Sequence, residues 1–222
     1  MQVLVTAAGS AFGQHFLAAL VRAGSLQRGD GLRMPVRRIL AVDRHQPPGL
    51  FVHEHVEYVR GELELPRFLS HVMGTITDSV FHLAVAQELA PARPAERRRE
   101  ILPASHASYQ ALEEELTLSF DTTRRLLEAC SFQAIPPKFV LGSGAQAGIA
   151  AAGERLGDPE GKGVHLALCE MLVVDGARRG LIDARCARLD AISPEAFDEA
   201  AARLLRAHDA PRASGVAMSG FD

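Results

Sequence analysis

The chain has 222 residues, of which 47% are hydrophobic and 23% charged, with a formal net charge of −3 at pH 7. This length fits one domain with a sizeable core, and the near-balance of 24 basic and 27 acidic residues argues against a nucleic-acid partner. No apolar run approaches the roughly 20 residues that span a bilayer and the start lacks the basic region of a signal peptide, so we expect a cytoplasmic protein without a membrane partner.

Short apolar runs rich in β-branched residues alternate with longer segments of helical periodicity from the start of the chain. This alternation is typical of an α/β fold with a doubly wound parallel sheet, as in Rossmann-like domains. The predicted strands are Gln2–Thr6, Arg38–Asp43, Val56–Arg60, Ser79–Leu83, Lys138–Gly142 and Ala184–Leu189, and the predicted helices are Phe12–Ala23, Pro66–Met73, Tyr109–Cys130 and Val164–Arg179.

The remaining segments fit a single domain. Ser193 followed by Pro194 is typical of a helix start and predicts a last helix. Two stretches, Ser25–Val36 and Val85–Ser108, interrupt the alternation, and we expect both to be surface insertions. Within the single domain 1–222, the nucleotide-binding core would cover residues 1–190, and a residual C-terminal helix and tail would cover residues 191–222.

The first predicted strand and helix are joined by a turn of small residues in VLVTAAGSAFG. Unpaired N–H groups and the macrodipole at the start of such a helix favour an anion, so this turn suits the pyrophosphate of a dinucleotide. Asp43 ends the second long strand, where a carboxylate accepts hydrogen bonds from ribose hydroxyls and repels a 2′-phosphate. The sequence therefore predicts NAD rather than NADP as the cofactor.

Segments along most of the chain match one family in order and spacing: VTAAGSAFG, ILAVD, Gly61-Glu62-Leu63, VFHLA, DTTRRLLEAC, FVLGSGAQAG and EMLVVDGARRGLIDARCARL. They resemble the extended short-chain dehydrogenases/reductases of the NAD-dependent epimerase/dehydratase family, and most closely its D-erythronate dehydrogenase-like members. The resemblance implies a Rossmann-like fold, NAD as cofactor, and a homodimer paired through the helices predicted at 109–130 and 164–179. It also implies cofactor contacts at Ala7, Ser10, Phe12, Gly13, Asp43, Glu62, Leu63, Leu83 and Ala84.

The chain departs from this family at the glycines of the phosphate loop. Aligned to the pattern T-G-x-x-G-x-x-G, the three glycine positions carry Ala7, Ser10 and Gly13, so only the third glycine remains. A Cβ at either of the first two positions tightens the turn or crowds the pyrophosphate. We therefore expect weakened NAD binding.

A second departure removes the family's Tyr-x-x-x-Lys pair, in which the tyrosine hydroxyl exchanges a proton with the substrate and the lysine lowers the pKa of the tyrosine. In the alignment the tyrosine position carries Lys162 and the lysine position carries Leu166. The two tyrosines of the chain, Tyr58 and Tyr109, lie elsewhere in the sequence. The family's catalytic serine corresponds to Ser143, which can hydrogen-bond a substrate oxygen.

Two further departures concern the surroundings of the site. The asparagine that the family carries ahead of its D-G-T segment, to support the active-site helix, corresponds to Ser119. After Leu189 the family continues through a substrate-binding lobe, whereas the last predicted helix of this chain follows almost at once. We therefore expect a shortened C-terminal substrate lobe.

Few other residues are candidates for chemistry. Lys162 and His165 lie in GDPEGKGVH, which reads as a Gly-rich turn, and with Ser143 they are the candidate catalytic residues. His82, at the end of a predicted strand, is interpreted as a hydrogen-bonded structural histidine. No residues show metal-ligand spacing, and no C-x-x-C pattern or even cysteine count indicates a disulfide framework, so we interpret Cys130, Cys169 and Cys186 as small buried side chains.

Three hypotheses for function follow from these patterns. The leading hypothesis is a degenerate family member that has lost hydride chemistry and acts as a binding or partner protein. The second is an active NAD-dependent oxidoreductase or epimerase on a sugar or sugar acid, with acid/base groups rebuilt from Ser143 and Lys162 or His165. The third is a lyase or isomerase that uses the same crevice for a small molecule without redox chemistry.

Overall fold

In this computed structural model the described residues are 1–44, 49–74, 77–83, 117–144, 162–189 and 193–211, without the side chains of 117, 118 and 162–164. The main element is a six-stranded sheet, and every neighbouring pair of its strands is parallel. In spatial order the strands are β5 (Val56–Arg60), β4 (Arg38–Asp43), β1 (Gln2–Thr6), β6 (Ser79–His82), β7 (Lys138–Gly144) and β8 (Asp183–Leu189).

The strand order reverses next to β1. The chain runs outward from β1 through β4 to β5, crosses back to β6 on the other side of β1, and continues to β7 and β8. In doubly wound sheets, ligands bind outside the carboxyl ends of the strands at such a reversal. The predicted fold class is confirmed, and the reversal places the candidate site beyond the ends of β1, β4 and β6.

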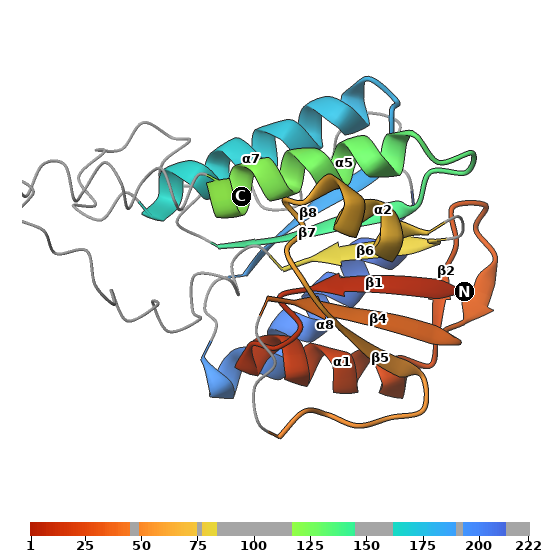
Figure 1. The fold of residues 1–222 in the computed structure, drawn as a ribbon. Coiled ribbons are helices and arrows are strands. Elements are labelled where there is room, and N and C mark those ends of the chain that lie inside the picture. The colour runs from red at the N-terminus through yellow and green to blue at the C-terminus, as the bar shows by residue number, and fades with distance from the viewer. Residues whose placement is uncertain (45–48, 75–76, 84–116, 145–161, 190–192, 212–222) are drawn as a thin grey trace, which may run out of the picture.

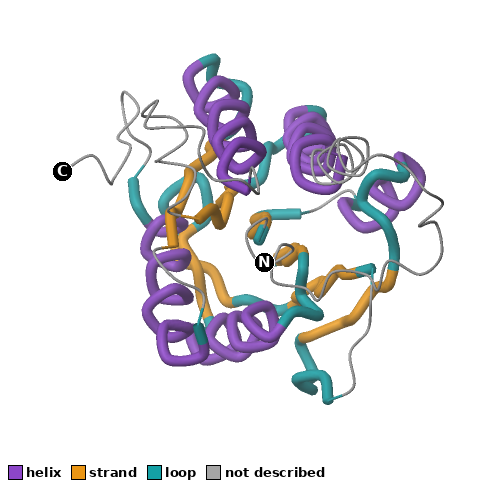
Figure 2. The backbone as a smooth tube through the Cα atoms, turned by 90° about the vertical axis from the view of Figure 1, so that its left-hand side faces the viewer, coloured by secondary structure: helices purple, strands orange, loops and turns teal. Residues whose placement is uncertain are grey.

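Helices cover both faces of the sheet, as Figures 1 and 2 show. Two of them, α1 (Ala11–Ala23) and α8 (Phe197–Asp209), pack against each other on one face. The other face carries α2 (Pro66–Met73), α5 (Thr122–Ser131) and α7 (Lys162–Arg178), which contact one another in that order. Side chains at the carboxyl ends of β6, β7 and β8 that point to this second face therefore meet α5 and α7.

The first strand and helix show how local sequence sets the core. Val3, Leu4 and Val5 of β1 have no exposed surface, because helices cover both faces of this central strand. In α1, Phe16 and Leu20 lie one turn apart on the buried side, and burial of each such side chain contributes about 1.5–3 kcal/mol. The helix ends at Gly24, whose φ of 63° is a conformation that glycine adopts without strain.

The segment 25–36 is bound to the domain rather than being a simple surface insertion. It forms an antiparallel hairpin of β2 (Ser25–Gln27) and β3 (Arg33–Pro35), and Leu26 is 1% exposed. The Gln27 N–H donates to Asp209 at the end of α8, over 3.0 Å, and Arg33 pairs with the same carboxylate. The surface expectation was wrong at the base of this hairpin because its backbone finds partners on α8; the other expected insertion, 85–108, lies outside the described residues.

Most predicted element boundaries agree with the structure within two residues, with two corrections. The described part of the predicted 109–130 helix begins with a π-helical turn, Thr117–Asp121, which leads into α5. The expected turn before His165 is helical from Lys162 onward, since α7 begins there. The predicted last helix is confirmed as a 3₁₀ turn, Pro194–Ala196, followed by α8.

All three cysteines are free; Cys130 and Cys169 are buried as expected, whereas Cys186 is only partly buried. Within the described ranges, no helix combines the length and the apolar character that crossing a bilayer would need.

Candidate functional site

The turn between β1 and α1 forms a compact loop at the carboxyl edge of the sheet. Ala7 has φ 52°, and within the described ranges it is the one residue other than glycine with positive φ. Ser10 caps α1, because its Oγ accepts a hydrogen bond from the Gly13 N–H at 2.9 Å and donates one to the Ala7 carbonyl at 2.8 Å. The chain thus keeps the tight turn without its first two glycines, with backbone strain at Ala7 and a side-chain cap from Ser10.

The third glycine position is occupied by Gly13 for a steric reason. A Cβ on Gly13 would lie 2.3 Å from the Ala7 carbonyl oxygen and 2.8 Å from the Ala8 Cα. The adjacent Phe12 side chain is 1% exposed and packs against Phe197, with ring centroids 5.4 Å apart. The Phe12 side chain therefore belongs to the core. The predicted cofactor contact at Phe12 is thus limited to its backbone, in the first turn of α1.

Asp43 lies directly beside this loop at the end of β4. Its Oδ2 accepts a hydrogen bond from the Gly9 N–H over 2.8 Å. The structure thus brings the predicted ribose ligand next to the predicted phosphate loop, across the neighbouring strands β1 and β4.

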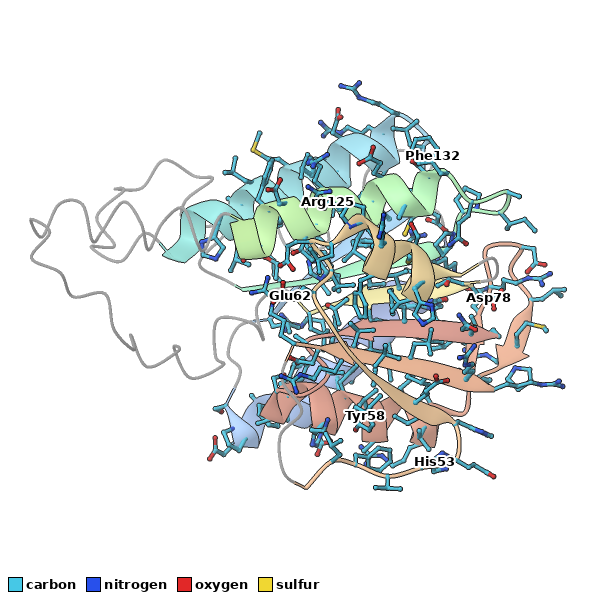
Figure 3. All side chains as sticks on the ribbon, viewed as in Figure 1. His53, Tyr58, Glu62, Asp78, Arg125 and Phe132 are labelled. Carbon is cyan, nitrogen blue, oxygen red and sulfur yellow. The ribbon has the colours of Figure 1, made fainter. Side chains whose placement is uncertain are left out.

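The other predicted cofactor contacts follow β5 and β6. Glu62 is exposed just after β5, at the same edge of the sheet in Figure 3, and Leu63 is 6% exposed. Leu83 is fully buried and its N–H donates to Thr6 Oγ1 over 3.1 Å. Ala84 lies outside the described residues.

Ser143 lies near the end of β7, in register with Arg188 of β8. Its side chain is fully buried, and its Oγ has no hydrogen-bond partner among the described residues. A buried hydroxyl without a partner is uncommon, because its desolvation is then not compensated. The arrangement is suited to a ligand oxygen that completes the hydrogen bond.

The first turns of α7 carry the positions where the family has its tyrosine and lysine. Lys162 begins the helix, and its side chain lies outside the described part. His165 and Leu166 are both fully buried, and Leu166 belongs to the hydrophobic core. An aliphatic side chain therefore occupies the position that the resemblance assigns to the lysine.

Tyr58 does not substitute for the missing tyrosine. Tyr58 lies on β5, at the opposite edge of the sheet from β8, near α1 in Figure 3. Its hydroxyl lies 3.0 Å from both the Gln14 Oε1 and the Phe51 carbonyl oxygen. Burial raises the pKa of the Tyr58 phenol, so this side chain stays neutral. Tyr109 lies outside the described residues.

His82 is confirmed as a structural histidine beneath the site. Its Nδ1 lies 2.7 Å from Thr6 Oγ1, and its Nε2 lies 3.0 Å from Thr123 Oγ1. Because Thr123 donates its own hydroxyl proton to the Ser119 carbonyl at 2.6 Å, Nε2 must carry the imidazole proton. Complete burial lowers the pKa of His82 to about 3, so the ring is neutral and fixed in one tautomer.

Sequence reasoning missed one buried ion pair, between Glu170 of α7 and Arg188 of β8. The Arg188 Nε lies 3.0 Å from Oε1, and its second guanidinium nitrogen lies 2.6 Å from Oε2, so the contact is bidentate. The hydrogen bond to Glu170 raises the pKa of Arg188. In the sequence, the indication was one charged residue in each of two largely apolar segments, EMLVV and CARL. The ion pair joins α7 to the end of β8.

Among the described side chains, no group of three His, Cys, Asp or Glu residues could hold a metal ion.

The candidate site consists of the β1–α1 loop and Asp43 on one side and Ser143 and the start of α7 on the other. The first part is where the sequence predicts an anion and a ribose, and the second offers a buried hydroxyl.

Known proteins resemble this chain in sequence and in fold. D-erythronate dehydrogenase of Cupriavidus necator is 28% identical over 199 residues, which are 87% of this chain and 56% of that protein. An epimerase of Methanothermobacter thermautotrophicus superposes with a TM-score of 0.58 at 18% identity, covering 84% of this chain and 50% of the epimerase. A dTDP-glucose 4,6-dehydratase of Streptomyces venezuelae, solved with NAD bound, superposes with a TM-score of 0.58 at 14% identity, covering 85% and 55%. No family model matches the chain.

The sequence match agrees with the predicted resemblance to the NAD-dependent epimerase/dehydratase family of extended short-chain dehydrogenases/reductases, with D-erythronate dehydrogenase as a distant match. The superposed structures show that the fold is shared. The chain spans about half the length of the relatives that it matches.

Proposed function

We propose that this chain binds NAD at the carboxyl edge of its sheet, lacks the tyrosine–lysine chemistry of its family, and acts as a binding or partner protein. The observation that carries the proposal is Leu166, a fully buried core side chain at the position of the family's lysine. An alkyl group can neither lower the pKa of a neighbouring acid nor take part in proton transfer.

The residues at the β1–α1 loop fit a dinucleotide. Ser10 and Gly13 keep the loop closely packed on the start of α1, where backbone N–H groups favour a phosphate. Asp43 is held beside the loop and offers carboxylate oxygens to the hydroxyls of a ribose. NAD is a hydride carrier in active relatives; the part of these residues is to bind and orient the nucleotide.

The other side of the site offers little for proton transfer. A serine hydroxyl such as that of Ser143 is a hydrogen-bonding group rather than an acid or base near pH 7. Tyr58 is bound to Gln14 and Phe51 at the far edge of the sheet. These contacts support binding of a small molecule or nucleotide without turnover of the family's kind.

Titration of the purified protein with NADH, followed by nucleotide fluorescence, tests the proposal together with a turnover assay on D-erythronate and NAD. We expect saturable binding and no turnover. Oxidation of a sugar acid at ordinary enzymatic rates, about 1–1,000 per second, would overturn the loss of chemistry. Absence of binding at millimolar NADH would overturn the cofactor. A double variant Ala7→Gly/Ser10→Gly that binds more tightly would identify the two side chains as the cause of weak binding.

A second candidate function is an active oxidoreductase or epimerase on a sugar or sugar acid, with acid/base groups rebuilt from Ser143 and Lys162 or His165. The observation that favours it is the buried Ser143 hydroxyl, which has no partner among the described residues. Turnover with NAD that is lost in Ser143→Ala would establish this function. Turnover by protein from which all bound nucleotide has been removed, with no NAD added, would indicate instead a lyase or isomerase in the same crevice.

We also propose that the chain forms a homodimer through α5 and α7. Met171 on the outer side of α7 is 66% exposed, which an apolar contact would cover. The outer positions of α5 carry the charged Arg124 and Glu128, so this interface would be mixed in character. Light scattering of the parent and of Met171→Lys is expected to give a dimer and a monomer; a parent protein that is monomeric at micromolar concentration would contradict this proposal.

A further inference from the structure

Gln14, one turn into α1, connects the β1–α1 loop to the far side of the helix. Its Nε2 donates to the Ala8 carbonyl at 2.5 Å, and its Oε1 accepts from the Phe51 N–H at 2.5 Å. The Tyr58 hydroxyl lies 3.0 Å from the same Oε1. Because the Ala8 carbonyl needs a donor and the Phe51 N–H needs an acceptor, only one orientation of the amide satisfies both.

The hydrogen bond from Gln14 is one of two that side chains make to a single peptide unit of the loop. The Ala8–Gly9 peptide has its carbonyl bound by Gln14 and its N–H bound by Asp43 Oδ2 at 2.8 Å. Reversal of this peptide would turn the Ala8 carbonyl oxygen toward the Asp43 carboxylate and the Gly9 N–H toward the side-chain amide NH₂ of Gln14. Both contacts would be repulsive, so the two side chains select one orientation of the peptide.

This peptide is where the loop most needs such support. It follows Ala7, whose positive φ is unfavourable for alanine by roughly 1–2 kcal/mol. It precedes Ser10, which stands at the second glycine position and caps the helix. In a loop that lacks two glycines, the path of the backbone must be fixed by other contacts.

We propose that Gln14 is a positioning residue for the nucleotide, which holds the Ala8–Gly9 peptide in the orientation that leaves the Asp43 carboxylate and the first amides of α1 set for ribose and phosphate. The inference rests on the proposed binding of NAD. Gln14 itself acts through the loop backbone rather than through contact with the ligand.

The test compares Gln14→Met, which keeps the length and apolar stem of the side chain but removes both hydrogen-bonding ends, with the parent protein. In the free protein, hydrogen exchange of the Gly9 amide is expected to become at least tenfold faster, because the Ala8–Gly9 peptide loses one of its two side-chain hydrogen bonds. In NADH titrations the dissociation constant is expected to rise about tenfold. An unchanged Gly9 exchange rate would overturn the inference, whether or not the parent binds NADH.

Gln27→Met is the matched control, since the Gln27 Nε2 also donates to a backbone carbonyl, that of Gly31 at 3.2 Å, in the distant β2–β3 hairpin. It should leave both the Gly9 exchange rate and the NADH affinity unchanged. Faster Gly9 exchange in Gln14→Met with unchanged NADH affinity would also overturn the inference, because the peptide would then not matter to the nucleotide. If the parent protein shows no NADH binding, the proposed function fails, while the exchange measurement still decides the role of Gln14 in the loop.

Discussion

The Gly9 N–H donates a hydrogen bond to Asp43 Oδ2 over 2.8 Å, so the end of β4 and the loop after β1 are joined directly. The carboxylate that the sequence assigns to ribose binding therefore also fixes the backbone of the phosphate loop. One substitution at this position therefore tests both the stability of the loop and the proposed affinity for a nucleotide.

Asp43→Ala should lower the free energy of unfolding by about 1.5–3 kcal/mol, the usual contribution of a hydrogen bond to a charged group. It should also weaken NADH binding about tenfold and reduce the preference for NAD over NADP, since no carboxylate then repels a 2′-phosphate. Urea denaturation and parallel NADH and NADPH titrations measure these effects. Asp30→Ala, in the exposed hairpin, removes a carboxylate that accepts from the Leu32 N–H and should change neither affinity.

Ala7→Gly should increase the free energy of unfolding by about 0.5–1 kcal/mol. The φ of 52° at Ala7 is strained for alanine and not for glycine, and this gain exceeds the entropy that glycine adds to the unfolded chain. Ala18→Gly, in the middle of α1, should instead lose about 1 kcal/mol. Equal destabilisation of both variants in thermal denaturation would show that the backbone at Ala7 is not strained.

Gly13→Ala should destabilise the protein by about 1–3 kcal/mol or more, because the new Cβ would lie 2.3 Å from the Ala7 carbonyl oxygen. The backbone of the loop would have to move, so NADH binding should weaken as well. Gly29→Ala is the control, since nothing lies within 4 Å of a Cβ at that position. A Gly13→Ala protein as stable as the control would mean that α1 can shift freely relative to the loop.

Glu170→Gln should cost about 3 kcal/mol, because it leaves the mostly buried Arg188 without its carboxylate partner. The double variant Glu170→Leu/Arg188→Met should recover part of this loss, since no buried charge then remains. Glu199→Gln removes an exposed pair with Arg206 and should change stability by less than about 1 kcal/mol. Free energies of unfolding from urea denaturation of the parent and the three variants check the expectation. A Glu170→Gln variant as stable as the parent would contradict it.

Stability should fall as the pH drops below about 6.5, because two buried histidines resist protonation in the folded state. Burial lowers the pKa of His82 to about 3 and that of His208 to about 4. Between the ordinary histidine pKa and these values, the unfolded chain binds protons that the folded chain does not. Each histidine then contributes a loss of about 1.4 kcal/mol per pH unit.

Urea denaturation at pH 7, 6 and 5 measures this slope. His208→Gln should reduce it by about half, because Ser79 Oγ, 2.8 Å from the His208 Nε2, can pair with an uncharged amide as well. A stability that is constant from pH 7 to pH 5 would show that the two imidazoles are not desolvated as the structure indicates.

The sequence by itself determined the fold class, because apolar periodicity and turn residues act over short distances along the chain. Every predicted strand is present, and Gly24 and Pro194 mark the helix boundaries that their backbone preferences dictate. The absence of the tyrosine–lysine pair was likewise readable from the residues themselves. The sequence also placed Asp43 at a strand end, where such a carboxylate meets the loop of the neighbouring strand.

The tertiary structure decided which polar groups meet. The pairing of Glu170 with Arg188, the bond from Gly9 to Asp43 and the anchoring of the β2–β3 hairpin on α8 join different elements of the fold. The bond from Gln14 to the Ala8 carbonyl spans only six residues, but it too forms only in the folded loop. Hydrogen bonds depend on distances of a few tenths of an ångström and on burial, which are set only when the helices pack on the sheet. Local pattern carries no information on these distances, so the contacts that fix the site became visible only in the folded chain.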